Sequence, residues 1–206
     1  MVIRAAAVLT VAVALSACSG SPTTRTSPSS APGAKEILAK PKNSTMRDAH
    51  FQVTAVIPLS SGVSINASGD GVLVKNPNAG RIQLTASAGS STFVYEEITV
   101  GGKDYSRENG GKWTVKPAAG IVGDFSDAVN PTYLGEETLA SGKAWHVKAT
   151  AREDNSPLEV WVREADGYPL KFIGQSSGVG TVTFVFDRFN IGASVSPPPP
   201  SEVQSG

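Results

Sequence analysis

Apolar and polar residues alternate along most of the chain from about residue 50 to residue 189. Phe51 and Val53 alternate with Gln52 and Thr54, and the same period of two recurs in segments as far as residue 189. This period is typical of antiparallel strands that have one face on a core and the other in water. Glycine-rich turns separate several of the segments. The sequence therefore predicts about ten strands, without the strand and helix alternation of a parallel sheet.

Three stretches depart from this pattern. Residues 34–47 have helical spacing, although Pro41 interrupts them. Residues 117–131 predict a short helix or a lid-like loop, and Gly69-Asp70-Gly71 predicts a break or bulge in one strand. The expected fold class is mainly β (α+β), with a large curled antiparallel sheet that forms a half-barrel and is covered by short helices.

The first twenty residues are typical of a secretory leader. Arg4 precedes an apolar stretch over residues 5–15, which is shorter than the about 20 residues of a membrane span. The leader ends in Leu15-Ser16-Ala17-Cys18, which resembles the lipobox of bacterial lipoproteins. The resemblance implies that Cys18 is lipidated and that the leader, residues 1–17, is cleaved before it. The alternative is a chance cysteine in an apolar leader.

Lipidation would attach the protein to the extracytoplasmic face of the cell membrane. Acyl chains on one residue, at about 0.8 kcal/mol per buried methylene, give stable attachment without a spanning helix. Residues 18–34 are rich in Ser, Thr and Pro, which predicts a disordered tether. Residues 35–192 form one domain, and residues 193–206 are predicted to be a disordered proline-rich tail.

Charge and cysteine content exclude some classes of function. The chain has 18 Lys and Arg residues and 18 Asp and Glu residues, and no basic stretch suggests nucleic-acid binding. Cys18 is the only cysteine, so the expected lipidation leaves no thiol for a disulfide or a thiolate metal site.

Few residues suggest catalysis. The two histidines are His50 and His146, and no Gly-x-Ser-x-Gly motif or zinc-ligand spacing occurs. The pair Glu96-Glu97 lies in a predicted strand, where neighbouring side chains point to opposite faces. One of the two could meet a polar head group from inside, or both could lie on a wet face or at an edge. We expect neither an enzyme nor a cofactor or metal.

Residues 132–173 carry a family resemblance. They contain Tyr133-Leu134-Gly135-Glu136-Glu137, a hairpin through Gly142, a strand through Trp161, and the turn Asp166-Gly167-Tyr168-Pro169. This layout resembles the LppX/LprA/LprF/LprG group of actinobacterial lipoproteins, which share the half-barrel of the LolA/LolB carriers. The resemblance spans about residues 35–192. It implies a pocket for lipids or glycolipids between the concave sheet and its helices, although the short helical region with Pro41 implies a smaller or more open cavity.

The apolar faces of the strands supply the candidate pocket lining. The residues expected to turn inward are Phe51, Val53, Ile65, Ile82, Leu84, Phe93, Trp113, Trp145, Val160, Val162, Phe172, Val182, Phe184 and Phe186. Ile121, Val122 and Phe125 form a candidate gate or an ordinary capping helix. A filled core needs the same residue types as a lipid cavity, so the sequence leaves both open.

Two functions follow from these alternatives. The first is a membrane-anchored lipoprotein that binds a lipid or another apolar ligand, for carriage or presentation in the cell envelope. The second is a non-enzymatic module with a filled core that contacts an envelope protein.

Overall fold

The structure is a computed structural model that describes residues 31–58, 64–118, 125–152, 154–176 and 180–204. From Pro32 onward the chain belongs to one compact unit. Within the described part no helix has the length and apolar composition needed to cross a membrane. The leader, Cys18 and most of the expected tether lie outside the described residues.

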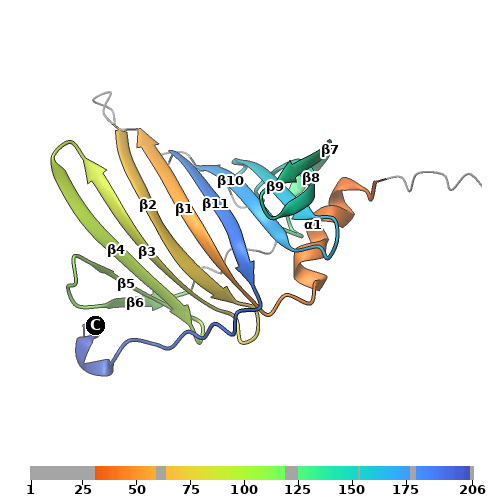
Figure 1. Cartoon of the computed structure of the whole chain (residues 1–206). Coiled ribbons are helices and arrows are strands. Elements are labelled where there is room, and N and C mark those ends of the chain that lie inside the picture. Colours follow the sequence, from red (N-terminus) through yellow and green to blue (C-terminus); the bar gives the residue numbers. More distant parts are fainter. Residues whose placement is uncertain (1–30, 59–63, 119–124, 153, 177–179, 205–206) are drawn as a thin grey trace, which may run out of the picture. The chain divides into compact units, whose positions relative to one another are not determined.

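In the part of the chain that the structure describes, eleven strands form one curled, open, antiparallel sheet (Figure 1). Its order is β6-β5-β4-β3-β2-β1-β11-β10-β9-β8-β7, so two meanders meet where β1 pairs with β11. The strands are β1 (Asp48–Pro58), β2 (Ser64–Val74), β3 (Ala79–Ala88), β4 (Ser91–Val100), β5 (Lys103–Glu108), β6 (Thr114–Pro117), β7 (Val129–Leu139), β8 (Gly142–Thr150), β9 (Pro157–Arg163), β10 (Pro169–Ser176) and β11 (Gly180–Phe189). The predicted fold class, a large curled antiparallel sheet, is confirmed.

Strand β2 is longer than the sequence predicts. It runs unbroken through Gly69 and Gly71, and it pairs with β1 without a register shift. An added Cβ at Gly71 would lie 2.5 Å from the Phe51 ring and 2.4 Å from the Arg81 carbonyl oxygen. The glycine therefore makes room for Phe51, and the prediction of a break or bulge was wrong.

One α-helix, α1 (Ala34–Asn43), packs on one end of the sheet, against β7, β8 and β9. Ile37 and Leu38 are fully buried there beside Val147 and Val160. The helix ends earlier than predicted and contains Pro41 in its last turn. In the described residues α1 is the only α-helix, so the expected cover of several short helices reduces to one helix over three strands.

The sheet has two faces that strand pairing separates. The helix-side face is the one on which α1 packs, and it includes Val147, Val160, Phe172 and Phe184, which lie in register on β8, β9, β10 and β11. The other face is called the opposite face. Apolar residues of β1 and β2 continue the helix-side face beyond β11.

The C-terminal segment differs from the disordered tail that composition predicts. Just before the predicted tail, Ile191 and Gly192 donate backbone N–H groups to the buried carboxylate of Asp48. Within the tail, a short 3₁₀ helix η1 (Pro200–Glu202) leads to Val203, which forms a parallel bridge with Trp113. The helix and the bridge give a defined structure to residues that composition alone assigns to disorder.

Candidate functional site

The helix-side face brings together thirteen of the fourteen predicted lining residues. Strand register places on this face Phe51, Val53, Ile65, Ile82, Leu84, Phe93, Trp145, Val160, Val162, Phe172, Val182, Phe184 and Phe186. All of them are buried or half-buried. Strand alternation therefore identified the correct face for these positions.

Trp113 is the exception. It precedes β6, where Thr114 pairs with Ser106, so Trp113 falls on the opposite face with Arg107. The Arg107 guanidinium lies 4.4 Å from the centroid of the Trp113 indole and also pairs with Glu96 at 2.6 Å. The C-terminal segment bonds to the Trp113 backbone, and the side chain is only 3% exposed. Its burial has a cause that the sequence did not reveal, and it lines no pocket on the helix-side face.

Much of the helix-side face is filled by its own side chains. The Phe184 ring centroid lies 4.5 Å from that of Phe172 and 5.3 Å from that of Phe51. Val160 and Val162 are completely buried in the cluster beneath α1. These residues form a packed core rather than the walls of one large cavity.

A smaller apolar groove of about 370 Å³ remains at one end of the neighbouring strands β9, β10 and β11, where β9 and β11 begin and β10 ends. Its floor consists of Leu158, Phe172, Val182 and Phe184. Gly174 lies between Leu158 and Val182 in the strand register and presents no side chain, which leaves the space open. The volume of the groove lies toward the lower end of the range of volumes found for small-ligand sites.

The sequence prediction included three of the nine described groove residues and missed six, which are Ala151, Ser156, Pro157, Leu158, Gly174 and Gln175. A glycine inside a strand signals a close approach or a missing side chain, but only the register shows which neighbours it separates. That register pairs Gly174 with Val182 on one side and Leu158 on the other.

A polar pocket of about 590 Å³ adjoins the groove and shares with it Ser156, Pro157 and Gln175. Its other lining residues include Asn155 and Thr181. An apolar compartment thus adjoins a compartment whose lining includes amide and hydroxyl groups and the carboxylate of Asp154.

The far end of the helix-side face, on β4 and β5, is polar. Glu97 lies on this face and accepts a 2.5 Å hydrogen bond from the Tyr95 hydroxyl, whereas Glu96 lies on the opposite face. Burial, and next the bond to Glu97, raise the pKa of Tyr95 above its usual value of 10.0. Nearby, Thr99 donates to the buried Asp104 at 2.6 Å. Glu97 is therefore the member of the pair that points inward, and it already has a partner.

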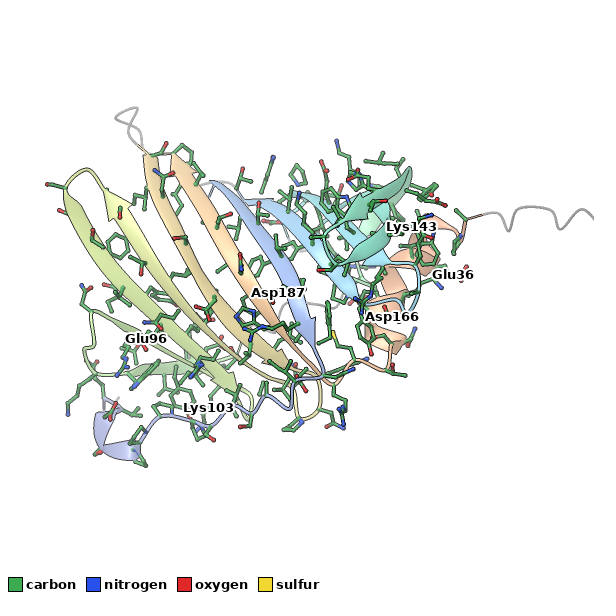
Figure 2. All side chains as sticks on the ribbon, viewed as in Figure 1. Glu36, Glu96, Lys103, Lys143, Asp166 and Asp187 are labelled. Atoms are coloured by element: carbon green, nitrogen blue, oxygen red, sulfur yellow. The ribbon has the colours of Figure 1, made fainter. Side chains whose placement is uncertain are left out.

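Both histidines lie on the opposite face, each between two carboxylates. His50 Nδ1 lies 2.6 Å from Asp187, and its Nε2 lies 3.5 Å from Asp70. Figure 2 shows Asp187 on β11. His146 lies between Glu137 at 2.8 Å and Glu159 at 3.0 Å. The described residues contain no group of three or more side chains arranged to hold a metal ion.

The candidate gate is described only in part. Phe125 is buried, and its ring centroid lies 5.6 Å from that of Phe172. Residues 125–128 form a turn rather than a helix. Ile121 and Val122 lie outside the described residues.

Comparison with known proteins supports the fold and goes no further. No protein-family model matches the sequence, and no curated protein does. An uncharacterized conserved protein from Thermus thermophilus has a TM-score of 0.53 and 16% identity, over 82% of this chain and 96% of that chain.

Two further solved structures are less similar. A DUF1329 family protein from Desulfovibrio piger has a TM-score of 0.39 and 10% identity, over 78% of this chain and 93% of that chain. A LolA superfamily protein from Nitrosomonas europaea has a TM-score of 0.38 and 9% identity, over 85% and 99%. Of these three, the Thermus protein alone supports a shared fold, and no activity follows from it.

Proposed function

We propose that this chain is a membrane-anchored lipoprotein that binds a lipid or another apolar ligand on the helix-side face, for carriage or presentation in the cell envelope. The observation that carries the proposal is the open apolar groove around Gly174. Burial of an acyl chain there would supply affinity at about 25 cal/mol per Å² of apolar area, with no chemical reaction. The groove also fits the smaller cavity expected within the LppX/LprG group.

Replacement of Gly174 by Leu tests the groove. An added Cβ at this position would meet only the Phe172 ring edge, at 3.4 Å, so the strand accepts a side chain. The leucine side chain would then fill the space between Leu158 and Val182. We expect bound lipid, measured by mass spectrometry after organic extraction, to fall at least several-fold while the melting temperature changes little.

Thr54→Leu is the matched control, because it adds the same side chain at an exposed position of β1 on the opposite face. Equal lipid content in Gly174→Leu, Thr54→Leu and the unmodified chain would reject the groove. A chain that carries no lipid at all would favour the alternative function, a module with a filled core that contacts an envelope protein.

The anchor has an independent test at Cys18. Cys18→Ala removes the thiol that the lipobox resemblance requires, so we expect the protein to lose acyl labelling and to leave the membrane fraction or stay unprocessed. Acyl labelling that persists in Cys18→Ala would contradict the anchor and leave the groove proposal intact.

A further inference from the structure

The groove and its polar neighbour form one site with two chemistries. The apolar part, lined by Leu158, Phe172, Val182 and Phe184, has a volume of about 370 Å³. The polar part measures about 590 Å³ and joins the groove through Ser156 and Gln175, which line both. A ligand that fills both parts must be an amphiphile, with its apolar tail over Gly174 and its head beside the loop between β8 and β9.

We propose that this site selects an amphiphile with a single acyl chain and an uncharged, hydroxyl-bearing head group, and discriminates against phosphate. The inference rests on the proposed function and names the ligand class for the same groove.

The restriction to one chain follows from packing around the groove. On one flank Val182 packs against the buried cluster of Ala55, Ala67 and Ala86, and on the other Phe172 contacts Phe125, with ring centroids 5.6 Å apart. Within the described residues these contacts occupy the helix-side face on both flanks of the groove. A second chain would have to separate side chains that are in contact, and overfilling a packed core is destabilising.

The preference for an uncharged head follows from the side chains of the polar part. Asn155 and Gln175 supply amide groups, and Ser156 and Thr181 supply hydroxyls, all of which can both donate and accept hydrogen bonds. Hydroxyl groups of a ligand find complementary partners among them.

Phosphate lacks the partners that it needs in this pocket. The described lining residues include no Lys or Arg, and their one ionisable member is the carboxylate of Asp154, which would repel an anion. Arg152 precedes the pocket in sequence but is not among its described lining residues, and its Nε donates to the Asp127 carbonyl oxygen at 3.1 Å. Asp154 itself is held in place by the Ser156 N–H at 3.0 Å.

Three lipids that share a glycerol backbone and a palmitoyl chain separate the effect of head-group charge from the effect of the number of acyl chains. They are 1-palmitoylglycerol, its phosphate ester 1-palmitoyl-lysophosphatidate, and dipalmitoylglycerol. Each is delivered from cyclodextrin to the delipidated full chain, and the bound fraction is measured by native mass spectrometry. We expect 1-palmitoylglycerol to bind one to one and about tenfold or more tighter than either of the others.

Asp154→Asn keeps a side-chain oxygen for the Ser156 N–H and removes the negative charge. The difference in affinity between 1-palmitoylglycerol and lysophosphatidate should therefore become smaller in this variant. Gly174→Leu should abolish the 1-palmitoylglycerol adduct, whereas Thr54→Leu should retain it.

Several outcomes overturn the proposal. Equal or tighter binding of lysophosphatidate overturns the head-group preference, and equal binding of dipalmitoylglycerol overturns the restriction to one chain. A 1-palmitoylglycerol adduct that survives in Gly174→Leu overturns the location. Binding without the expected selectivity rejects this inference alone, whereas the absence of binding by all three lipids rejects the proposed function with it.

Discussion

Glu137 shows how single side chains on the opposite face are linked across strands. Its carboxylate accepts a hydrogen bond from Trp161 Nε1 at 2.9 Å and lies 2.8 Å from His146 Nδ1. The His146 ring stacks on Trp161 with centroids 4.0 Å apart, and the Lys171 ammonium lies 4.4 Å from the centroid of the same indole. The bond from Trp161, followed by the attraction of His146, lowers the pKa of Glu137 below its usual 4.5.

This shift predicts a dependence of stability on pH. Because the pKa is lower in the folded state, ionised Glu137 stabilises the fold above about pH 4.5, and the contribution is lost as the pH falls through the folded-state pKa. In Glu137→Gln we expect the free energy of unfolding, measured by urea titration, to fall less steeply with pH below 4.5. Trp161→Phe, which removes the first cause of the shift, should flatten the same part of the profile. If the unfolding free energy of both variants falls with pH as steeply as that of the unmodified chain, Glu137 is not the source of this pH dependence.

Residue positions were predictable where alternation alone decides them. Phe184 was assigned to the correct face because its neighbours two positions away in the same strand, Val182 and Phe186, are also apolar. Trp113 was misplaced because it lies just outside β6, and its burial comes from a segment almost ninety residues later. Gly174 carries no side chain, so its role emerges only from its two cross-strand neighbours.

At the scale of elements, α1 joins the apolar cluster beneath it through two of its three buried side chains. Ile37 and Leu38 are 0% and 1% exposed against the helix-side face of β8 and β9. Leu38→Ala leaves a cavity there and should lower the free energy of unfolding by about 2–5 kcal/mol. Lys35→Ala, at an exposed position of the same helix, should change it little. Similar values for the two variants would show that α1 does not contribute to the core as described.

Strand boundaries were predictable to the extent that local patterns define them. The turn at Gly101-Gly102 is one of the glycine-rich turns that separate the predicted strands, and both residues have positive φ angles. The glycines of β2 looked similar in sequence but serve a different purpose. Gly71 leaves space for the Phe51 ring of a neighbouring strand, and no local pattern separates that role from a turn.

At the scale of the whole molecule, the C-terminal segment connects β11 to the far edge of the sheet, as Figure 1 shows. The Trp113 N–H donates to the Glu202 carbonyl oxygen at 2.9 Å, and the Gln204 N–H donates to that of Trp113 at 2.8 Å. Each such bond contributes about 1 kcal/mol.

Deletion of residues 200–206 should therefore speed amide hydrogen exchange at Trp113. The exchange rate should rise about tenfold for each ~1.4 kcal/mol by which the free energy of local opening falls. Exchange at Val160, in the middle of β9, is the internal control and should stay unchanged. Unaltered exchange at Trp113 would show that the segment does not hold this edge of the sheet.

The pairing of β1 with β11 has a consequence for how the chain acquires its fold. Ala49 lies opposite Phe189, so the centre of the sheet joins residues from the two ends of the domain. A chain synthesised from its N-terminus completes β1 to β6 by local hairpins, but β1 has no second partner until the last strand emerges. Closure of so long a loop late in the process slows folding. The nascent polypeptide therefore remains incompletely folded until its synthesis is almost finished.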